Sequence, residues 1–410
     1  MKQSTWRLLL EFFFVTLFLV VTGVTLFFAN GYRIDVDEGS VQKTSIIDIV
    51  TPKTETEVYL DGEQLAELLP IQIKNVLPGV HDLSVRKEGF TVWSREVEVK
   101  EDVVSIVRDV LLVPNDLEPY KTGIVTFNED EKLIYGDGFI MAVTPGSNLI
   151  RAMIFGNRGA FHEEEMDLFR SDFEVLQTYS DLSLFLRFPD KEYAFLDLAS
   201  RQFKQFYLPE TSVDIYIDAN GRRVYYLDNS SLYAISFDDL PVEMPDSFDP
   251  EIVDVIKSDI ENYVITRNGQ IFYVSGGTLY LMNHEEDEVT LLDENAEKVK
   301  QIALYPGLKY ELLLVEYETG EKDLFFYDIS KTILRHIRKL ETGMMPIGWF
   351  DESGHYLLDS GNSVIVADIY DTDDVVLLKD TQSDYVFGKD GALYWTGQGA
   401  LNRLYWKDEL

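Results

Sequence analysis

Residues 218–227 read Asp-Ala-Asn-Gly-Arg-Arg-Val-Tyr-Tyr-Leu, a polar turn followed at once by a dense apolar strand. Asp, Asn and Gly favour tight turns, whereas Val and Tyr favour strands. The same order of turn and strand returns in six further segments between residues 118 and 410. These segments are Asn128–Tyr135, Pro189–Phe195, Arg267–Val274, Pro306–Val315, Asp351–Leu358 and Lys389–Trp395. The chain therefore carries an internal repeat.

The repeat has a regular length. Gly221 and Gly391 stand 170 residues apart, and three copies between them divide this distance into four intervals of about 42 residues. A second marker, a polar residue that ends a short apolar strand, recurs at separations of 39, 47, 45, 40 and 39 residues. Its positions are Asp197, Ser236, Asn283, Asp328, Asp368 and Lys407.

A repeat of roughly 40–50 residues with about four short strands is typical of a β-propeller blade. Helical repeats of similar length need apolar residues at a 3.6-residue spacing, whereas these segments alternate with period two and are broken by Gly, Asn and Asp. We therefore predict an all-β chain with a β-propeller over residues 118–410. About seven blades fit the markers, with six or eight as alternatives, and residues 156–175 are a candidate insertion.

The turn-then-strand pattern resembles the blades of WD-repeat-like and TolB-like propellers. No Trp-Asp pair ends a blade and no sialidase-type Asp box occurs. The resemblance therefore implies a fold and no substrate.

Shorter strands and tighter turns mark residues 44–115, where turn signals at intervals of roughly 8–12 residues predict an antiparallel sandwich. The order of these turns resembles the PEGA domain, a small β-sandwich of bacterial and archaeal surface-layer and envelope proteins. The resemblance covers about residues 44–113 and is carried by Pro52, Val58–Gly62, Pro70, Leu77–His81, Lys87–Phe90 and Trp93-Ser94. The namesake Pro-Glu-Gly-Ala tetrad is not intact, since Lys-Thr-Glu follows Pro52, so the resemblance implies the fold and no ligand.

The positions that we single out in this sandwich are structural turn and core positions. They are Pro52, Asp61, Gly62, Pro78, Gly79, Gly89, Phe90 and Trp93. The glycines are expected to supply positive φ at turns, and the two aromatic residues to fill the core rather than bind sugar.

Residues 8–28 form an apolar run of 21 residues, about 31 Å as a helix, marked by Leu8, Phe12, Leu19 and Phe28. Basic residues precede it and acidic residues follow it, which predicts a cytoplasmic tail over residues 1–7 and extracytoplasmic domains beyond a linker at 29–43. We therefore predict a single-pass cell-membrane protein held in the lipid bilayer by an uncleaved anchor. A cleaved signal peptide is the alternative, although the run is longer than the usual apolar region of such peptides.

Charge and cysteine content narrow the function classes. Asp and Glu number 72 against 36 Lys and Arg, a formal charge of -36, which would repel nucleic acid. The absence of cysteine excludes disulfides and thiolate metal sites.

No residue pattern indicates catalysis, a cofactor or a metal. The five histidines lack metal-ligand spacing, His284 stands beside Glu285–Asp287 in a predicted solvated loop, and Asp218–Gly221 lacks the further ligands of a calcium loop. We expect a non-catalytic module that binds or scaffolds an envelope protein or glycan. Two alternatives stay open: a hydrolase or lyase of envelope polysaccharide that uses carboxylates in the propeller channel, and a sensor that signals through a partner helix.

Overall fold

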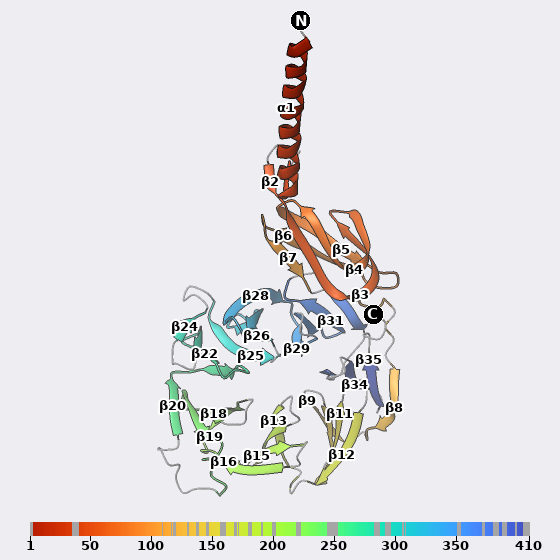
Figure 1. The fold of residues 1–410 in the computed structure, drawn as a ribbon. Coiled ribbons are helices and arrows are strands. Elements are labelled where there is room, and N and C mark those ends of the chain that lie inside the picture. Colours follow the sequence, from red (N-terminus) through yellow and green to blue (C-terminus); the bar gives the residue numbers. More distant parts are fainter. Residues whose placement is uncertain are drawn as a thin grey trace. The chain divides into compact units, whose positions relative to one another are not determined.

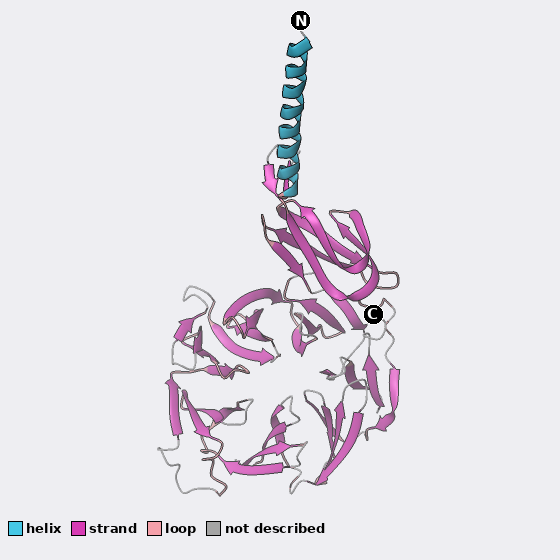
Figure 2. Ribbon diagram, viewed as in Figure 1, coloured by secondary structure: helices cyan, strands magenta, loops and turns pink. Residues whose placement is uncertain are grey.

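The structure is a computed structural model. It describes residues 3–34, 41–108, 110–115, 117, 120–128, 131–136, 139–144, 147–155, 161–167, 170, 172–178, 183–189, 192–198, 202–218, 223–243, 253–282, 288–291, 297–305, 307, 309–350, 354–370, 374–379, 385–387, 392–397 and 400–404. The chain divides into two compact units, Met1–Asp116 and Leu117–Glu409. Strands dominate both units, as Figure 2 shows, and the all-β prediction is confirmed.

The first unit begins with helix α1 (Gln3–Ala29), which contains the predicted span. Within it, residues 10–29 are apolar enough to cross a membrane or to act as a signal sequence, and none of this stretch is buried in the protein. The side chains of Phe12, Leu19 and Phe28 are all exposed, and Leu8 lies in the first half of the helix. Thr25 donates its hydroxyl to the carbonyl of Val21 at 2.7 Å, so this polar side chain is satisfied within the helix.

Five strands build the sandwich that follows. They are β3 (Ser45–Leu60), β4 (Glu63–Val76), β5 (Gly79–Arg86), β6 (Trp93–Val99) and β7 (Val104–Val107). The sheet order is β4-β3-β5-β6, with β7 also paired to β3. The β3–β7 pair is parallel, which differs from the purely antiparallel prediction.

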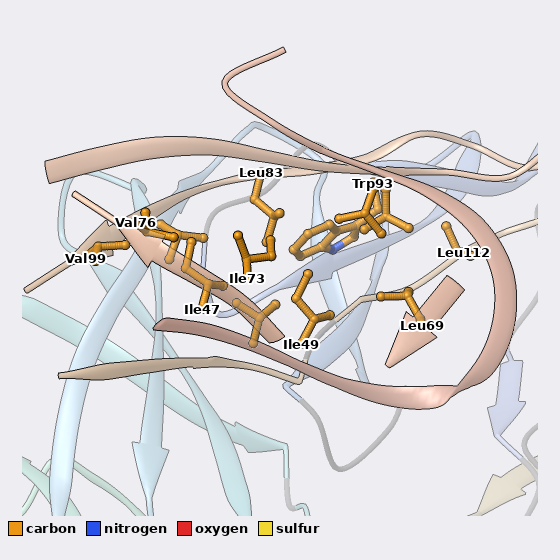
Figure 3. Close-up of a cluster of buried hydrophobic side chains, with 13 residues drawn as sticks. Ile47, Ile49, Leu69, Ile73, Val76, Leu83, Trp93, Val99 and Leu112 are labelled. Carbon is orange, nitrogen blue, oxygen red and sulfur yellow. The ribbon is translucent and has the colours of Figure 1, made fainter. Parts of the chain in front are cut away.

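Register shifts explain how five strands enclose a core. The β3–β4 pair shifts register at four places, and such bulges bend a strand pair. The first half of β3 can then pair with β7 while its last residues pair with β5. Figure 3 shows the apolar side chains that meet inside the bend, among them Ile47, Leu83 and Trp93.

Two short strands lie between the helix and the sandwich. Strand β1 (Tyr32–Ile34) pairs in antiparallel fashion with β2 (Val41–Lys43). Both fall within the stretch that we predicted as a linker, so its described residues carry regular structure.

The described residues of the second unit form seven four-stranded sheets. In order from the first to the last strand, six of them are β9-β10-β11-β12, β13-β14-β15-β16, β17-β18-β19-β20, β21-β22-β23-β24, β25-β26-β27-β28 and β29-β30-β31-β32. Their bounds are β9 (Lys132–Gly136), β10 (Phe139–Val143), β11 (Leu149–Phe155), β12 (Phe161–Asp167), β13 (Glu174–Thr178), β14 (Ser183–Arg187), β15 (Glu192–Asp197), β16 (Gln202–Tyr207), β17 (Val213–Ile217), β18 (Arg223–Asp228), β19 (Ser231–Ser236), β20 (Val253–Ser258), β21 (Asn262–Ile265), β22 (Ile271–Ser275), β23 (Thr278–Met282), β24 (Glu288–Thr290), β25 (Val299–Tyr305), β26 (Tyr310–Tyr317), β27 (Lys322–Asp328), β28 (Ile333–Leu340), β29 (Met345–Trp349), β30 (His355–Asp359), β31 (Ser363–Asp368) and β32 (Val375–Lys379). Seven sheets lie within the predicted range of six to eight. The candidate insertion was wrong in part, because residues 161–167 form a regular outer strand.

The seventh sheet closes the ring. It joins β33 (Tyr385–Phe387), β34 (Leu393–Gly397) and β35 (Ala400–Leu404) to β8 (Tyr120–Thr126), the first strand of the unit. The first strands of neighbouring sheets lie side by side, for example β13 with β17 and β33 with β9. Figure 1 shows the resulting circular arrangement, so the predicted β-propeller is confirmed.

Burial on both faces explains why the second strand of each sheet is a continuous apolar run. Each apolar cluster in this unit combines residues of two adjacent sheets, so neighbouring sheets pack face to face. The second strand then has one sheet on either side, as in β10, where all five residues are buried. The period-two alternation that we expected does not hold for these strands.

Candidate functional site

A cavity of about 570 Å³ lies at the centre of the propeller, where the first strands of three sheets meet. Its described lining comes from β9, β13, β29 and the last residue of β30. The residues are Lys132, Leu133, Ile134, Tyr135, Glu174, Val175, Met345, Pro346, Ile347 and Asp359. The volume is in the range of pockets that hold small molecules or a short segment of a partner.

The charged residues of the described lining lie at one end of the first strands. Lys132, Glu174 and Met345 are each the first residue of their strand, and Asp359 is the last residue of the adjacent second strand. Register shifts occur in two of these strands, between Val175 and Gln177 and between Pro346 and Gly348. A bulge re-aims side chains next to it, which is a common device at the rim of a binding site.

Both carboxylates of the cavity have partners within the protein. Glu174 forms an ion pair with Arg187. Asp359 accepts the backbone N–H of Gly361 at 2.7 Å. The remaining lining is largely aliphatic, with Tyr135 as its aromatic member, so the site offers apolar contact together with a few charged groups at one end.

A second cluster of polar groups is buried between the fourth and fifth sheets. Glu311 in β26 has no exposed surface. Its Oε1 accepts the backbone N–H of Arg267 at 2.6 Å, whereas its Oε2 has no hydrogen-bond partner among the residues that the structure describes. Burial raises the pKa of this carboxyl to about 7, although the bond and charge of Arg267 act in the opposite direction.

The turn at residues 266–270, which Glu311 contacts through Arg267, is stabilised by hydrogen bonds of the turn's own side chains. Thr266 donates its hydroxyl to Asn268 Oδ1 at 2.6 Å and accepts the N–H of Gln270 at 2.9 Å. The hydroxyl of Tyr327, which lies opposite Glu311 in the sheet, donates to the Gln270 amide oxygen. Two neighbouring sheets are therefore joined by hydrogen bonds as well as by apolar packing.

Sequence reasoning did not single out Glu311. Its position can be compared between sheets. In a sheet with a polar marker at the end of its third strand, the residue equivalent to Glu311 lies in the second strand, opposite the residue that precedes the marker. Four other sheets have an apolar or aromatic residue at this position. These are Leu184, Val224, Ile271 and Tyr356. The available signal was a carboxylate in the apolar run of residues 310–315, but only the register shows that it faces inward.

The histidines and the Asp218–Gly221 turn, for which the sequence predicted no chemical role, lie in different parts of the fold. His81, His336 and His355 lie in β5, β28 and β30, and His162 lies in β12. The His284–Asp287 cluster and most of the Asp218–Gly221 turn lie outside the described residues. In the part of the chain that the structure describes, no group of three or more His, Cys, Asp or Glu could hold a metal ion.

The structure brings several of the singled-out turn residues of the sandwich together. Asp61 accepts hydrogen bonds from His81 Nδ1 at 2.7 Å and from the backbone N–H of Asp82 at 3.0 Å. Burial opposes ionisation of Asp61, but these two hydrogen bonds outweigh it and hold its pKa below the usual value. His81 Nε2 lies 2.8 Å from the carbonyl of Leu77, so the histidine ties two turns to each other.

The remaining positions lie at turns and in the core. Gly62, Gly79 and Gly89 all have positive φ. Trp93 is buried, and Phe90 packs against the same core while being partly exposed. Pro78 is half-buried beside Gly79 and Pro52 lies within β3. Residues 44–109 match the family model of the PEGA domain.

No curated protein matches the chain in sequence. Solved structures with a similar shape include a catalytically inactive virginiamycin B lyase from Staphylococcus aureus with quinupristin, at 11% identity and a TM-score of 0.42, covering 70% of this chain and 98% of that one. A chain of a mitotic checkpoint complex has 12% identity and a TM-score of 0.41, covering 75% and 96%. A chain of a yeast heterotrimeric nucleoporin complex has 11% identity and a TM-score of 0.42, covering 68% and 98%.

Proposed function

We propose that this chain is a non-catalytic recognition protein of the cell envelope, anchored by its N-terminal helix, with the propeller outside the cytoplasm. The combination of an apolar N-terminal helix, a PEGA domain and a β-propeller fits a membrane-anchored envelope protein. The flanking charges support a cytoplasmic N-terminus. Localisation is tested by protease treatment of intact cells, which should remove the propeller and leave the helix in the membrane fraction.

The observation that carries the recognition role is the cavity at the propeller centre. Its aliphatic lining suits an apolar portion of a ligand or of a partner protein, and its charged residues at one end can fix the orientation. Aromatic platforms, which bind sugar rings, contribute only Tyr135 to the described lining. This composition favours a protein or other partly apolar ligand over a glycan.

Native mass spectrometry of the full-length protein in detergent tests this role. Val175→Trp is designed to fill the cavity, while Val255→Trp places the same side chain on the exposed outer strand β20. We expect a co-purified adduct on the wild type and on Val255→Trp that is lost from Val175→Trp. An adduct of equal occupancy on all three proteins would refute the cavity as the recognition site.

The competing proposal is a polysaccharide hydrolase that uses Glu174 and Asp359, since both line the cavity. A glycosidase needs one of its two carboxyl groups protonated and the other ionised. In this structure both carboxylates are engaged by groups of the protein, Glu174 by Arg187 and Asp359 by the backbone N–H of Gly361. Release of reducing ends from cell-wall polysaccharide by the wild type, abolished by Glu174→Gln or Asp359→Asn, would establish the hydrolase instead.

A further inference from the structure

The end of the PEGA domain that is joined to the helix carries five exposed apolar side chains. Tyr32 is 38% exposed, Val41 56%, Val80 64%, Val103 50% and Val104 49%. They belong to different segments, namely β1, β2, β5, the turn that leads into β7 and the first residue of β7 itself. Val50, Leu65, Leu68, Val92 and Ile106 are similarly exposed elsewhere in the domain, so the distinguishing feature of the first set is its position beside the helix end.

Hydrogen bonds hold this end of the PEGA domain close to the C-terminal end of α1. Thr44, directly before β3, donates both its N–H and its hydroxyl to the carbonyl of Gly31, at 2.8 and 2.7 Å. Gly31 is only two residues beyond the end of α1. The start of the sandwich is therefore held within one turn of the helix terminus.

Arg33 makes a second connection. Its guanidinium donates to the carbonyl of Phe28 in the helix at 3.1 Å and to Asn75 Oδ1 in the sandwich at 2.9 Å. The same guanidinium lies over the ring of Phe28, 5.2 Å from its centroid. Since Asn75 lies two residues before the turn that leads to Gly79, the β4–β5 turn is drawn to the helix end as well.

The β6–β7 turn joins this end through Lys43. The ammonium of Lys43 pairs with Asp102 at 2.5 Å, and its backbone N–H donates to Glu101 at 2.9 Å. The two acids beside Val103 and Val104 are therefore engaged within the protein. Gly79 pairs with Val99 across β5 and β6, which places Val80 next to the same turn.

Aromatic residues mark where the helix would leave the bilayer. Trp6 stands near the start of α1, and at its far end Phe27 stacks on Tyr32 with 5.1 Å between ring centroids. Aromatic side chains at both ends of a span are typical of the two membrane–water interfaces. A helix of 27 residues is about 40 Å long, enough to cross a hydrocarbon core of about 30 Å and reach both interfaces.

We propose that Tyr32, Val41, Val80, Val103 and Val104 form a lipid-contact surface that rests in the headgroup layer of the outer leaflet. The inference depends on the proposed membrane anchor, since the anchor brings this end of the PEGA domain to the bilayer. Its occupant is the lipid surface itself, because the surface is continuous with the helix end and Lys43 engages the two acids of the β6–β7 turn, Glu101 and Asp102. The PEGA domain then contacts the membrane through several residues, in addition to its attachment through the helix.

The cysteine-free chain allows a direct test. Single-cysteine variants of the full-length protein, labelled with an environment-sensitive fluorophore, are placed in nanodiscs that contain nitroxide-headgroup lipid. The test positions are Val80→Cys and Val104→Cys. The matched control is Val92→Cys, which is 52% exposed but lies at the opposite end of β6, about 20 Å along the strand from Val99.

We expect several-fold stronger quenching and a blue-shifted emission at positions 80 and 104 relative to position 92. Leu19→Cys, probed with an acyl-chain nitroxide, reports separately on the helix. Quenching at position 19, with positions 80 and 104 no more quenched than 92, would overturn the lipid-contact surface and leave the anchor intact. No quenching at position 19 would overturn both.

Discussion

Replacing Glu311 by Gln should make the propeller more stable, and the gain should depend on pH. The carboxyl has no exposed surface and its pKa is raised by burial to about 7, from a reference value of 4.5. At about 1.4 kcal/mol per pKa unit, this shift corresponds to a penalty of up to about 3 kcal/mol when the group is ionised. Gln keeps the oxygen that accepts the Arg267 N–H and carries no charge.

The direction of the pH effect follows from proton binding. Between its unfolded and folded pKa values, Glu311 binds more protons in the folded state, so the folded state loses stability as pH rises. The penalty is complete above about pH 8 and vanishes below about pH 4, where both states are protonated. Glu311→Gln should therefore raise the free energy of unfolding by up to about 3 kcal/mol at pH 8 and hardly at all at pH 4.

Urea unfolding of the full-length protein, followed by near-ultraviolet circular dichroism at several pH values, measures this difference. Glu316→Gln is the matched control on the same strand. Glu316 is hydrogen-bonded by Lys300 at 2.7 Å, which lowers its pKa, so its contribution to stability is present at neutral pH and is lost as pH falls. The two variants should thus change stability with opposite sign at pH 8. A Glu311→Gln effect that is equal at pH 4 and pH 8, or a destabilisation at pH 8, would refute the burial argument.

Three further substitutions test other parts of the fold. Asp61→Asn should cost the PEGA domain up to about 1 kcal/mol above pH 5, because the hydrogen bonds that hold the pKa of Asp61 below its usual value are screened by solvent at this half-exposed side chain, and the cost should shrink in acid. Thermal unfolding at several pH values measures it, and a cost that grows in acid would contradict the role of His81. Gly307→Ala should destabilise the propeller by more than about 2 kcal/mol in urea unfolding, because a Cβ there would lie 2.5 Å from Trp349 Cδ1; an unchanged midpoint would show that the turn relaxes freely. Leu19→Arg places a charge near the middle of the helix at a cost of about 3 kcal/mol for insertion and should move protein from the membrane to the soluble fraction, whereas Leu19→Ile should not; equal membrane fractions would argue against a span.

The repeat was predictable because its markers act locally. Asp328 ends β27 and accepts hydrogen bonds from the Ser330 N–H, the Ser330 hydroxyl and the Lys331 N–H, which shapes the turn into the next strand. Asp368 accepts the N–H of Tyr370 in the same way. A side chain that bonds its own neighbours leaves a signature in sequence spacing.

Long-range pairing left no comparable signature. Strand β8 opens the propeller unit, yet it completes the last sheet by pairing with β35. Likewise, the cavity depends on first strands that are distant in sequence, β9, β13 and β29. Neither feature follows from any local run of residues, because each requires the ring to be closed first.

The contacts at the helix end could not be predicted either, because they also join residues that are distant in sequence. The sequence suggested a linker over residues 29–43, since that stretch is polar. The hydrogen bond of Arg33 to Asn75 and the ion pair of Lys43 with Asp102 join residues that are far apart in the chain.

Glu311 connects the fold to the question of function. A second propeller strand is buried on both faces, so a carboxylate there loses its hydration on either side, and its sister positions are apolar for that reason. The hydrogen bond from the Arg267 N–H needs only an acceptor oxygen, which Gln supplies without a charge. The hydrogen bond to Arg267 therefore does not explain why a carboxylate that lowers stability stands at this position. If Glu311→Gln is more stable and keeps the cavity adduct, the charge serves neither folding nor the cavity. If the stabilised variant loses the adduct, the Glu311 carboxylate affects ligand binding from a position between the fourth and fifth sheets, outside the described lining of the cavity.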